Sequence, residues 1–271
     1  MIGLEGLLAG RVYDLEQPRF QGAPAMPVHE PNFALALHRR HEPGTGEPRT
    51  GASGLLVMAE HSGTHIDALC HQAEDLRMHG DTAVDASVQT FRGFTALGVD
   101  TIAPIVVRGV LIDVAAHAGV DRLPDEHAVS AAELEAAATA QGVEVRSGDA
   151  VLVRTGNGAL WESDPERYMR APGMAGDASA ALAARGAFVV GADNVAWDVP
   201  GGGVDPAVGS TLPGHVLLLV RAGIHIVENL ALEELAAAAV REFVFVCLPL
   251  KVRGGTGSPV RPIAIAPAQS P

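Results

Sequence analysis

Residues 60–72 read EHSGTHIDALCHQ, a stretch with three histidines and an aspartate in a chain that has 11 histidines among 271 residues. A helix would place His61 and His65 on one face but would turn Asp67 about 200° away from His65. The Gly63-Thr64 pair also disfavours a helix. In an extended segment side chains alternate, so positions 61, 65, 67 and 71 would all face the same way. We therefore expect an extended stretch that directs three imidazoles and a carboxylate at one point.

These side chains have the composition of a metal site. Imidazole nitrogen and carboxylate oxygen suit Zn²⁺, Mn²⁺ or Fe²⁺. No cysteine stands at the converging positions, which favours an open catalytic site over a closed structural zinc site. The alternative is a set of separate surface histidines beside a chance acidic residue, because short metal motifs produce false positives.

The composition is that of a folded globular protein, with 48% hydrophobic and 19% charged residues. A net charge of −13 without any basic stretch disfavours nucleic acid as a partner. The apolar runs are too short for a membrane helix, and the N-terminus lacks the basic start of a signal peptide. The two cysteines, Cys70 and Cys247, allow at most one disulfide, so we expect a reducing, cytoplasmic location.

Short runs rich in Val, Ile and Phe alternate with helical stretches along the chain. A capping box from Ser130 to Glu133 opens a helix that Gly142 ends, and Asp177 is expected to cap another. The elements interleave without a strict βαβ rhythm, so we expect one α/β domain over residues 1–271 with a mixed sheet. The expected strands are 33–38, 55–60, 109–115, 150–154, 187–193, 223–228 and 242–250, and the expected helices are 130–141, 178–185 and 231–240.

The segment HSGTHIDALCH at 61–71 resembles the H-x-G-T-H-x-D-x-x-x-H signature of the metal-dependent cyclase family, which includes bacterial kynurenine formamidase and isatin hydrolase. Leu69 stands where many members have proline and Gln72 where an aromatic residue is frequent, which bears on substrate preference more than on metal binding. The resemblance continues in VLVRTGNGALW (151–161), GADNVAWD (191–198), LPGHVLLLVRAGIHIVENL (212–230) and PLKVRGGTGSPVRPIAI (249–265).

The resemblance implies a swivelling β/β/α-like fold and a homodimer or larger assembly such as a homotetramer. It also implies one or two Zn²⁺ or Mn²⁺ ions per subunit. The implied site residues are His61, His65 and Asp67 as metal ligands, His71 as proton donor and acceptor, and His215 and Glu228 either as ligands of a second metal or as pocket residues. From the residues alone, Glu228 indicates a salt bridge or a helix cap, and His215 lies where a helix could start.

A divalent cation with such ligands lowers the pKa of water from about 15.7 to about 7 and polarises a carbonyl. The leaving group needs a proton, and an imidazole titrates in the required range. We therefore expect an amidohydrolase that opens a C–N bond of a small substrate. A bicyclic lactam such as isatin is the first candidate, N-formylkynurenine the second and a lactone a close variant. The non-catalytic alternative is a metal-binding or ligand-binding module.

Other residues are weaker candidates. Trp161 and Trp197 offer flat surfaces for an aromatic substrate, although a buried structural role is more common for tryptophan. His79 could face the pocket, and His225 is expected to be solvated or hydrogen-bonded. No G-x-S-x-G or phosphate-binding glycine motif occurs, which disfavours a serine hydrolase or a nucleotide enzyme. The histidines expected to be exposed are His29, His38, His41, His117 and His127.

Overall fold

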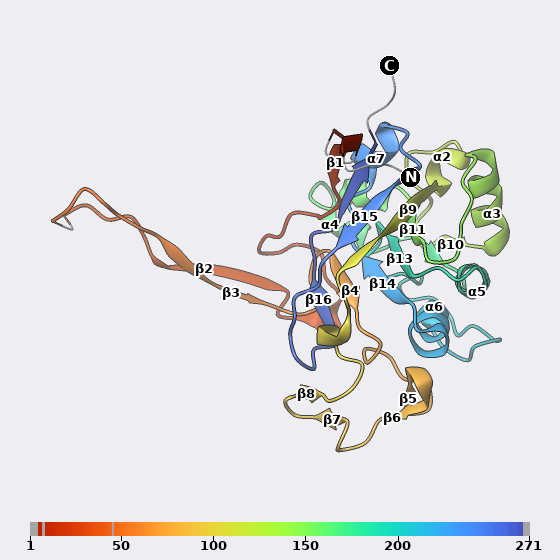
Figure 1. Cartoon of the computed structure of the whole chain (residues 1–271), viewed down its shortest axis with the longest axis horizontal. Coiled ribbons are helices and arrows are strands. Elements are labelled where there is room, and N and C mark those ends of the chain that lie inside the picture. The colour runs from red at the N-terminus through yellow and green to blue at the C-terminus, as the bar shows by residue number, and fades with distance from the viewer. Residues whose placement is uncertain (1–4, 7–8, 45, 268–271) are drawn as a thin grey trace.

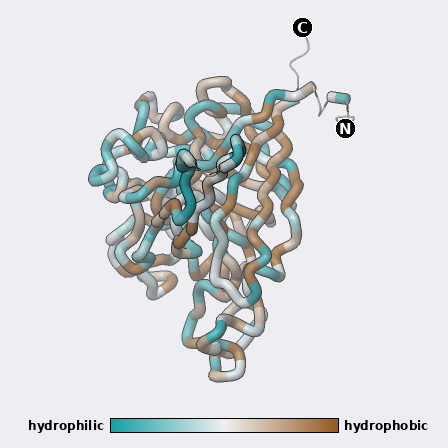
Figure 2. Tube along the Cα trace, turned by 90° about the vertical axis from the view of Figure 1, so that its left-hand side faces the viewer, coloured by the Kyte–Doolittle hydropathy of each residue, from teal (hydrophilic) through white to brown (hydrophobic). Residues whose placement is uncertain are grey.

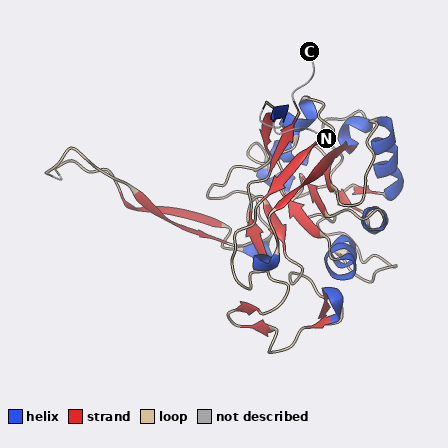
Figure 3. Cartoon of the chain, in the orientation of Figure 1, coloured by secondary structure: helices blue, strands red, loops and turns tan. Residues whose placement is uncertain are grey.

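A nine-stranded sheet runs through the computed structural model, which describes residues 5–6, 9–44 and 46–267 (Figures 1 and 3). The strand order is β1-β17-β15-β9-β11-β13-β14-β4-β16. These strands are β1 (Arg11–Asp14), β4 (His65–Asp67), β9 (Ile105–Asp113), β11 (Ala150–Arg154), β13 (Val189–Ala192), β14 (His225–Glu228), β15 (Glu242–Cys247), β16 (Gly257–Pro259) and β17 (Ile263–Ala266).

The middle of the sheet is parallel and its borders are antiparallel. Strands β9, β11, β13 and β14 pair in parallel in chain order, whereas β15, β17 and β1 on one side and β4 and β16 on the other pair antiparallel. The expected mixed α/β fold is confirmed. A βαβ rhythm does exist in the middle, but long loops and short helices in the crossovers obscure it in the sequence.

The crossovers between the parallel strands contain most of the helices, and of these α2, α3, α5 and α6 lie to one side of the sheet in Figure 1. Main helices α3 and α5 lie in the first two crossovers, and α6 continues as a π-helix in the third. The helices are α2 (Val114–His117), α3 (Ala131–Ala140), α4 (Pro165–Tyr168), α5 (Gly176–Ala184), α6 (Pro213–His215), the π-helix η5 (Val216–Ala222) and α7 (Glu233–Ala237), with 3₁₀ turns η1 (Pro27–His29), η2 (His79–Asp81), η3 (Val99–Thr101) and η4 (Asn157–Leu160).

Helix ends follow the local sequence in one case and depart from it in another. The predicted capping box is present, because Ser130 N–H donates to Glu133 Oε2 (2.9 Å) and Glu133 N–H donates to Ser130 Oγ (3.3 Å). The prediction that Asp177 caps α5 is wrong. The cap position is Ala175, and Asp177 lies in the first turn, where its carboxylate faces the positive helix end.

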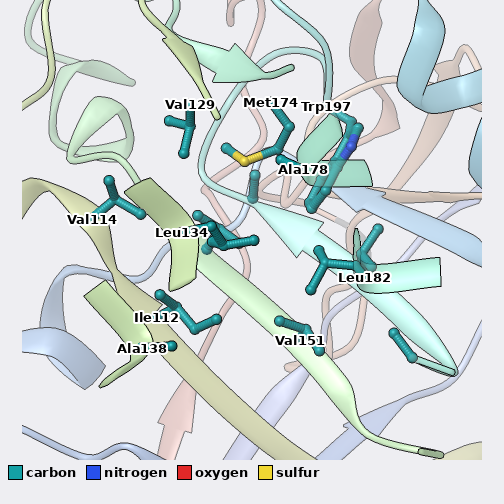
Figure 4. Close-up of a cluster of buried hydrophobic side chains, with 14 of the residues drawn as sticks. Ile112, Val114, Val129, Leu134, Ala138, Val151, Met174, Ala178, Leu182 and Trp197 are labelled. Carbon is teal, nitrogen blue, oxygen red and sulfur yellow. The ribbon is translucent and has the colours of Figure 1, made fainter. Parts of the chain in front are cut away.

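Apolar residues cover both faces of the central strands, which explains why these strands are continuously hydrophobic. On β9, Ile112 belongs to the core under the helices, whereas its neighbour Leu111 belongs to the core on the other face. Figure 4 shows the first core, where Ile112 and Val151 lie near Leu134 of α3 and Leu182 of α5. Burial of each such side chain stabilises the fold by about 1.5–3 kcal/mol. The two cores therefore hold the central strands of the sheet in place.

A long two-stranded ribbon projects from this body (Figure 1). Its strands are β2 (Phe33–Arg39) and β3 (Ser53–Met58), which pair antiparallel, and we call residues 33–58 the β2–β3 ribbon. Its turn end is hydrophilic, as the view in Figure 2 shows. Large apolar side chains nevertheless stay exposed on both of its faces, namely Leu35, Leu37, Leu55, Leu56 and Val57.

Two small hairpins and a parallel pair complete the described secondary structure. No helix in residues 5–6, 9–44 and 46–267 combines the length and apolarity that a bilayer crossing requires. Residues 1–4 and 7–8, in the N-terminal stretch whose lack of a basic start was noted in the sequence, lie outside the described part. Cys70 and Cys247 are both buried and unpaired. The small strands are β5 (Arg77–Met78), β6 (Thr82–Ala83), β7 (Gln89–Thr90), β8 (Gly93–Phe94), β10 (Ala128–Val129) and β12 (Gly173–Met174).

Candidate metal centre

The candidate centre lies where the parallel part of the sheet meets the short strand β4. Strand β4 pairs with β14 on one side and β16 on the other, and Glu228 is the direct partner of His65. His65 and Asp67 are two residues apart on one strand, so their side chains share a face. The predicted alternation is therefore correct for these two residues, and the sheet register adds Glu228 beside them.

His61 and His71 reach the centre by turns, so the prediction of one extended segment over 61–71 is wrong outside 65–67. Gly63 has a left-handed backbone with φ of 56°, and a Cβ there would collide with the guanidinium of Arg19. The backbone N–H of His71 donates to the carbonyl of Ala68 (2.9 Å), which closes a second turn. Two reversals thus bring both rings back over β4.

All six residues that the sequence and the resemblance single out for metal binding and proton transfer are brought together. Potential ligand atoms of His61, Asp67 and His71 lie within 4.8 Å of one another, and so do those of Asp67, His215 and Glu228. His65 Nε2 lies 3.6 Å from Asp67 Oδ1 and 3.3 Å from Glu228 Oε2. Asp67 is common to both groups, so one carboxylate stands between two possible ion positions.

Hydrogen bonds on the far side of two rings determine which nitrogen faces the centre. His65 Nδ1 lies 2.8 Å from the carbonyl oxygen of Gly63, and His215 Nδ1 lies 2.6 Å from Asp198 Oδ2. A carbonyl and a carboxylate can only accept, so both Nδ1 atoms carry hydrogen. When these rings are neutral, Nε2 is the unprotonated nitrogen and faces the Asp67 and Glu228 carboxylates, which is the orientation of a ligand histidine.

His61 is oriented by the opposite nitrogen. Its Nε2 lies 2.9 Å from Thr256 Oγ1, and that hydroxyl donates its hydrogen to Glu60 Oε2 (2.6 Å). The hydroxyl oxygen can therefore only accept from His61 Nε2–H, which leaves Nδ1 as the unprotonated nitrogen. Nδ1 lies 2.8 Å from Asp67 Oδ1, but the two atoms do not form a hydrogen bond.

The donor set fits a divalent cation. Both oxygens of Asp67 and the Nδ1 atom of His61 are buried and lack hydrogen-bond partners within the described protein. A buried carboxylate without donors is strongly unfavourable, because it has lost its hydration. A divalent ion coordinated by these atoms would provide the missing interaction, and the oxygen and nitrogen donors are those that Zn²⁺ and Mn²⁺ prefer.

The two carboxylates are held in their charged form by their histidine neighbours. Burial alone would raise the pKa of Asp67, but the imidazoles of His71 and His61 outweigh burial and keep it well below its ordinary value. Burial likewise opposes ionisation of Glu228, whose pKa falls to about 2 because His215 and His65 donate to it. The centre therefore presents two negative charges.

The pKa values of the imidazoles between these carboxylates shift in the opposite direction, upward. Burial lowers the pKa of His65, but the hydrogen bond to Glu228 and the charge of Asp67 raise it above its ordinary value overall. For His215 burial is again outweighed, here by Asp198 and Glu228, and its pKa is raised well above the ordinary value. Among the protein groups alone, protons on these two rings balance the carboxylates, so a metal ion competes with protons for the same positions.

His71 differs from the other rings because it is half-buried and carries the least proton affinity. Its ring centroid lies 4.0 Å from that of His61 and 6.1 Å from that of His215. Burial, against the opposing charge of Asp67, lowers the pKa of His71 to about 3. This imidazole is therefore neutral near neutral pH, and within the described chain no protein group forms a hydrogen bond with either of its ring nitrogens.

His29 is a residue of the centre that sequence reasoning missed. It was expected to be exposed, but it is half-buried and its ring stacks on His61 with centroids 4.8 Å apart. It lies on η1, immediately before the β2–β3 ribbon, and far from the histidine window in sequence. Its Pro-Val-His-Glu-Pro context reads as an exposed turn, so no local pattern could have identified it.

The proposed substrate-contacting residues lie elsewhere. Trp161 and Trp197 are 1% and 0% exposed, and their indole N–H groups donate to the carbonyl of Pro18 and to Ser179 Oγ. Figure 4 shows Trp197 within the helix-side core. Neither indole offers a ring face to a substrate, so their expected role is corrected to packing. His79 donates from Nδ1 to the carbonyl of Val220 and packs on η5, outside the metal-ligand groups.

This mixed sheet, with buried imidazoles and carboxylates converging at its border and a neutral imidazole beside them, defines a hydrolase built around a divalent metal centre. The comparison with known proteins agrees. The family model described as a cyclase (Cyclase) matches residues 13–199. The chain belongs to this Cyclase family, and the resemblance seen in residues 61–71 is confirmed.

Named relatives cover nearly the whole chain. It is 26% identical over 258 residues to the kynurenine formamidase of Paracidovorax citrulli, which covers 95% of this chain and 97% of the relative. It is 30% identical over 277 residues to the isatin hydrolase of Roseibium aggregatum, with 96% and 94% covered. A solved structure described as a novel cyclase matches with a TM-score of 0.84 at 26% identity, over 96% of this chain and 88% of that chain.

Proposed function

We propose that this enzyme hydrolyses a C–N bond in a small cyclic amide or N-acyl compound, with a bicyclic lactam of the isatin type as the first substrate class. The observation that carries the proposal is the pair of buried Asp67 oxygens without hydrogen bonds, with His61 Nδ1 and His65 Nε2, the ring nitrogens available to a metal, directed toward them. The relatives named isatin hydrolase and kynurenine formamidase support the choice of bond.

His61, His65 and Asp67 hold the first ion in this proposal, and His215 and Glu228 share Asp67 to hold a second. The donor types suit Zn²⁺ or Mn²⁺. Asp67 and Glu228 together balance the charge of one divalent ion. When bound, the cation acidifies water and polarises the substrate carbonyl.

His71 moves the proton. Its neutral ring accepts a proton from the water that attacks the carbonyl carbon and returns it to the leaving nitrogen as the C–N bond breaks. A lactam then opens to an amino carboxylate, and a formamide yields formate and an amine. The partial exposure of His71 allows contact with a bound substrate, while the ligand-oriented rings are buried.

We further propose a homodimer or larger assembly in the cytoplasm. The exposed leucines of the β2–β3 ribbon support an assembly, because an isolated hairpin is only marginally stable in water. The ribbon contains Arg39, Arg40 and Arg49 against Glu42 and Glu47, whereas the whole chain is acidic, so a second copy offers charge complementarity. Two unpaired cysteines support a reducing compartment.

The test is metal analysis combined with a hydrolysis screen. Purified protein is analysed for bound metal, stripped with a chelator, and reconstituted with Zn²⁺ or Mn²⁺. Each sample is then assayed on cyclic imides, lactams, lactones and aryl formamides. We expect turnover of a lactam to disappear on stripping and to return with metal. A protein that binds metal and hydrolyses no member of the panel would be a binding module, contrary to the proposal.

A further inference from the structure

Asn229, the residue after Glu228, joins the two chain segments that carry the candidate ligands. It is 2% exposed and has a left-handed backbone with φ of 56°. Its side-chain Nδ2 donates to the carbonyl of Gly63 (2.9 Å), and its own carbonyl accepts from Thr64 Oγ1 (2.6 Å). The Glu228 segment and the turn between His61 and His65 are therefore connected by two hydrogen bonds through a single residue.

Tyr168 determines which way the Asn229 amide points. Its hydroxyl donates to Asn229 Oδ1 (2.7 Å), and burial raises its pKa well above the ordinary value, so it remains a donor. Oδ1 must then face Tyr168 and Nδ2 must face Gly63, because only the nitrogen can donate to a carbonyl. The backbone N–H of Asn229 donates to the carbonyl of Asn194 (2.8 Å), which anchors the residue further.

The Gly63 carbonyl connects the Asn229 amide to the imidazole of His65. It accepts from Asn229 Nδ2 and also from His65 Nδ1 (2.8 Å), so its direction sets the rotation of the imidazole. The neighbouring carbonyls of Ser62 and Thr64 are both held by the guanidinium of Arg19 on the other side of the turn. Side chains thus hold three successive carbonyls, and the Asn229 contact is the one shared with a candidate ligand.

We infer that Asn229 and Tyr168 are positioning residues of the metal centre, which aim His65 Nε2 at the ion through the Gly63 carbonyl. This inference rests on the proposed function, because it assumes that His65 is a ligand. Groups that orient a metal-binding imidazole typically change metal affinity 10–100-fold when altered, so roughly that range applies here.

The experiment measures Co²⁺ binding to chelator-stripped full-length protein, without substrate, by calorimetry and by the visible absorption of the bound ion. Asn229→Asp keeps the shape but places an oxygen against the Gly63 carbonyl, and Tyr168→Phe removes only the hydroxyl. We expect Co²⁺ affinity to fall about 10–100-fold in Asn229→Asp and by about tenfold or less in Tyr168→Phe. Both variants should also show an altered absorption spectrum, which a loss of stability alone would not produce.

Gln141→Ala is the matched control. Gln141 likewise bonds a main-chain carbonyl with its side-chain amide, that of Asp113 (2.6 Å), but it lies at the end of α3 outside the candidate centre. It should keep the wild-type Co²⁺ affinity and spectrum even if its unfolding temperature drops. Asn194 and Arg19 are left unchanged in all variants, so the backbone anchors of the turn remain.

The positioning role and the proposed function fail on different results. Wild-type affinity and spectrum in Tyr168→Phe and in folded Asn229→Asp would overturn the inference while the proposed function stands. If Asn229→Asp does not fold, as judged by circular dichroism, Tyr168→Phe decides alone. A wild-type protein that takes up no Co²⁺, Zn²⁺ or Mn²⁺ would overturn the proposed function and this inference together.

Discussion

The metal centre and the β2–β3 ribbon reverse the usual distribution of polar and apolar residues. At the centre, Asp67 is 0% exposed and its oxygens lack protein hydrogen bonds, whereas on the ribbon Leu55 is 61% exposed. A folded chain normally hydrates its charges and buries its leucines. In the proposed function, a cation would coordinate the Asp67 oxygens and the apolar surface of a second copy would cover the leucines of the ribbon.

The two regions are also adjacent in the chain. The ribbon begins shortly after His29, which stacks on His61, and it ends shortly before His61 itself. Phe33 pairs with Met58 at the base of the ribbon, and the backbone N–H of Ala59 donates to the carbonyl of Asn32 (3.2 Å). If the ribbon packs on a second copy as proposed, that contact would also fix the chain segments that carry His29 and His61.

The largest effect is expected from Asp67→Asn, because Asp67 belongs to both ligand groups. Neutralising it should remove bound metal and lower turnover more than about 10⁴-fold, beyond the loss from one proton-transfer group. Elemental analysis and kcat/KM on the best lactam measure the two effects. Full metal content in this variant would show that the buried carboxylate has another purpose. Asp177→Asn, an exposed residue of α5 outside both ligand groups, is the control and should keep both.

His71→Ala should separate chemistry from metal binding. Metal content should stay at the wild-type level, while kcat falls about 10²–10⁴-fold because the proton-transfer group is lost. Small imidazoles added to the assay should restore part of the rate. An unchanged kcat would show that His71 does not transfer the proton. The contrast between the buried centre and the exposed ribbon would not be affected.

The double variant Leu35→Ser, Leu56→Ser tests the ribbon. These residues pair across the two strands, so both changes fall on one face. Each leucine buried in a subunit contact contributes about 1.5–3 kcal/mol, so the dissociation constant should rise at least about 100-fold for the pair. Light scattering over a dilution series measures it. Val120→Ser, an exposed apolar residue outside the ribbon, should have no effect. A wild-type chain that is monomeric at high concentration would contradict the assembly.

A smaller effect is expected of pH on the affinity for metal. The pKa values of His65 and His215 are raised, and a cation requires both rings to be neutral. Protons therefore compete increasingly as pH falls through the raised values, and metal affinity should decrease by about tenfold per pH unit for each displaced proton. Calorimetry in buffers with different ionisation enthalpies counts the protons released. Affinity that is independent of pH on the acidic side would argue against these rings as ligands.

The smallest effect concerns the thiols. Burial raises the pKa of Cys70 and of Cys247 to about 12, so neither is a reactive thiolate near neutral pH. Iodoacetamide should modify the folded protein negligibly and both residues after unfolding, as mass spectrometry can show. Rapid modification of the native protein would indicate that the border of the sheet near Cys70 opens.

Local patterns in the sequence identified the histidine window because three rings and a carboxylate stand within one short segment. The residues were identified correctly but the conformation was not, since Gly63 turns the chain before β4. Strands β9 and β11 were predictable from continuous apolar runs, yet their βαβ relation was not, because the crossovers are long and irregular.

Residues that act from a distance could not be found in this way. His215 and Glu228 were identified only through the family resemblance, since an isolated buried carboxylate on a strand equally suggests an ion pair. Asp198 fixes the His215 tautomer and His29 covers His61, but each lies in a segment with no repeated ligand spacing. Their positions depend on tertiary packing, which a single sequence does not display.

The position of β4 in the sheet also governs when the centre can form during synthesis. Both of its neighbours, β14 and β16, are encoded far downstream, so a ribosome releases the histidines well before either flanking strand exists. At typical elongation rates this interval is roughly ten to thirty seconds. In a nascent chain, these histidines lack their final partners until nearly the whole polypeptide has emerged. A prematurely terminated product therefore cannot assemble the centre.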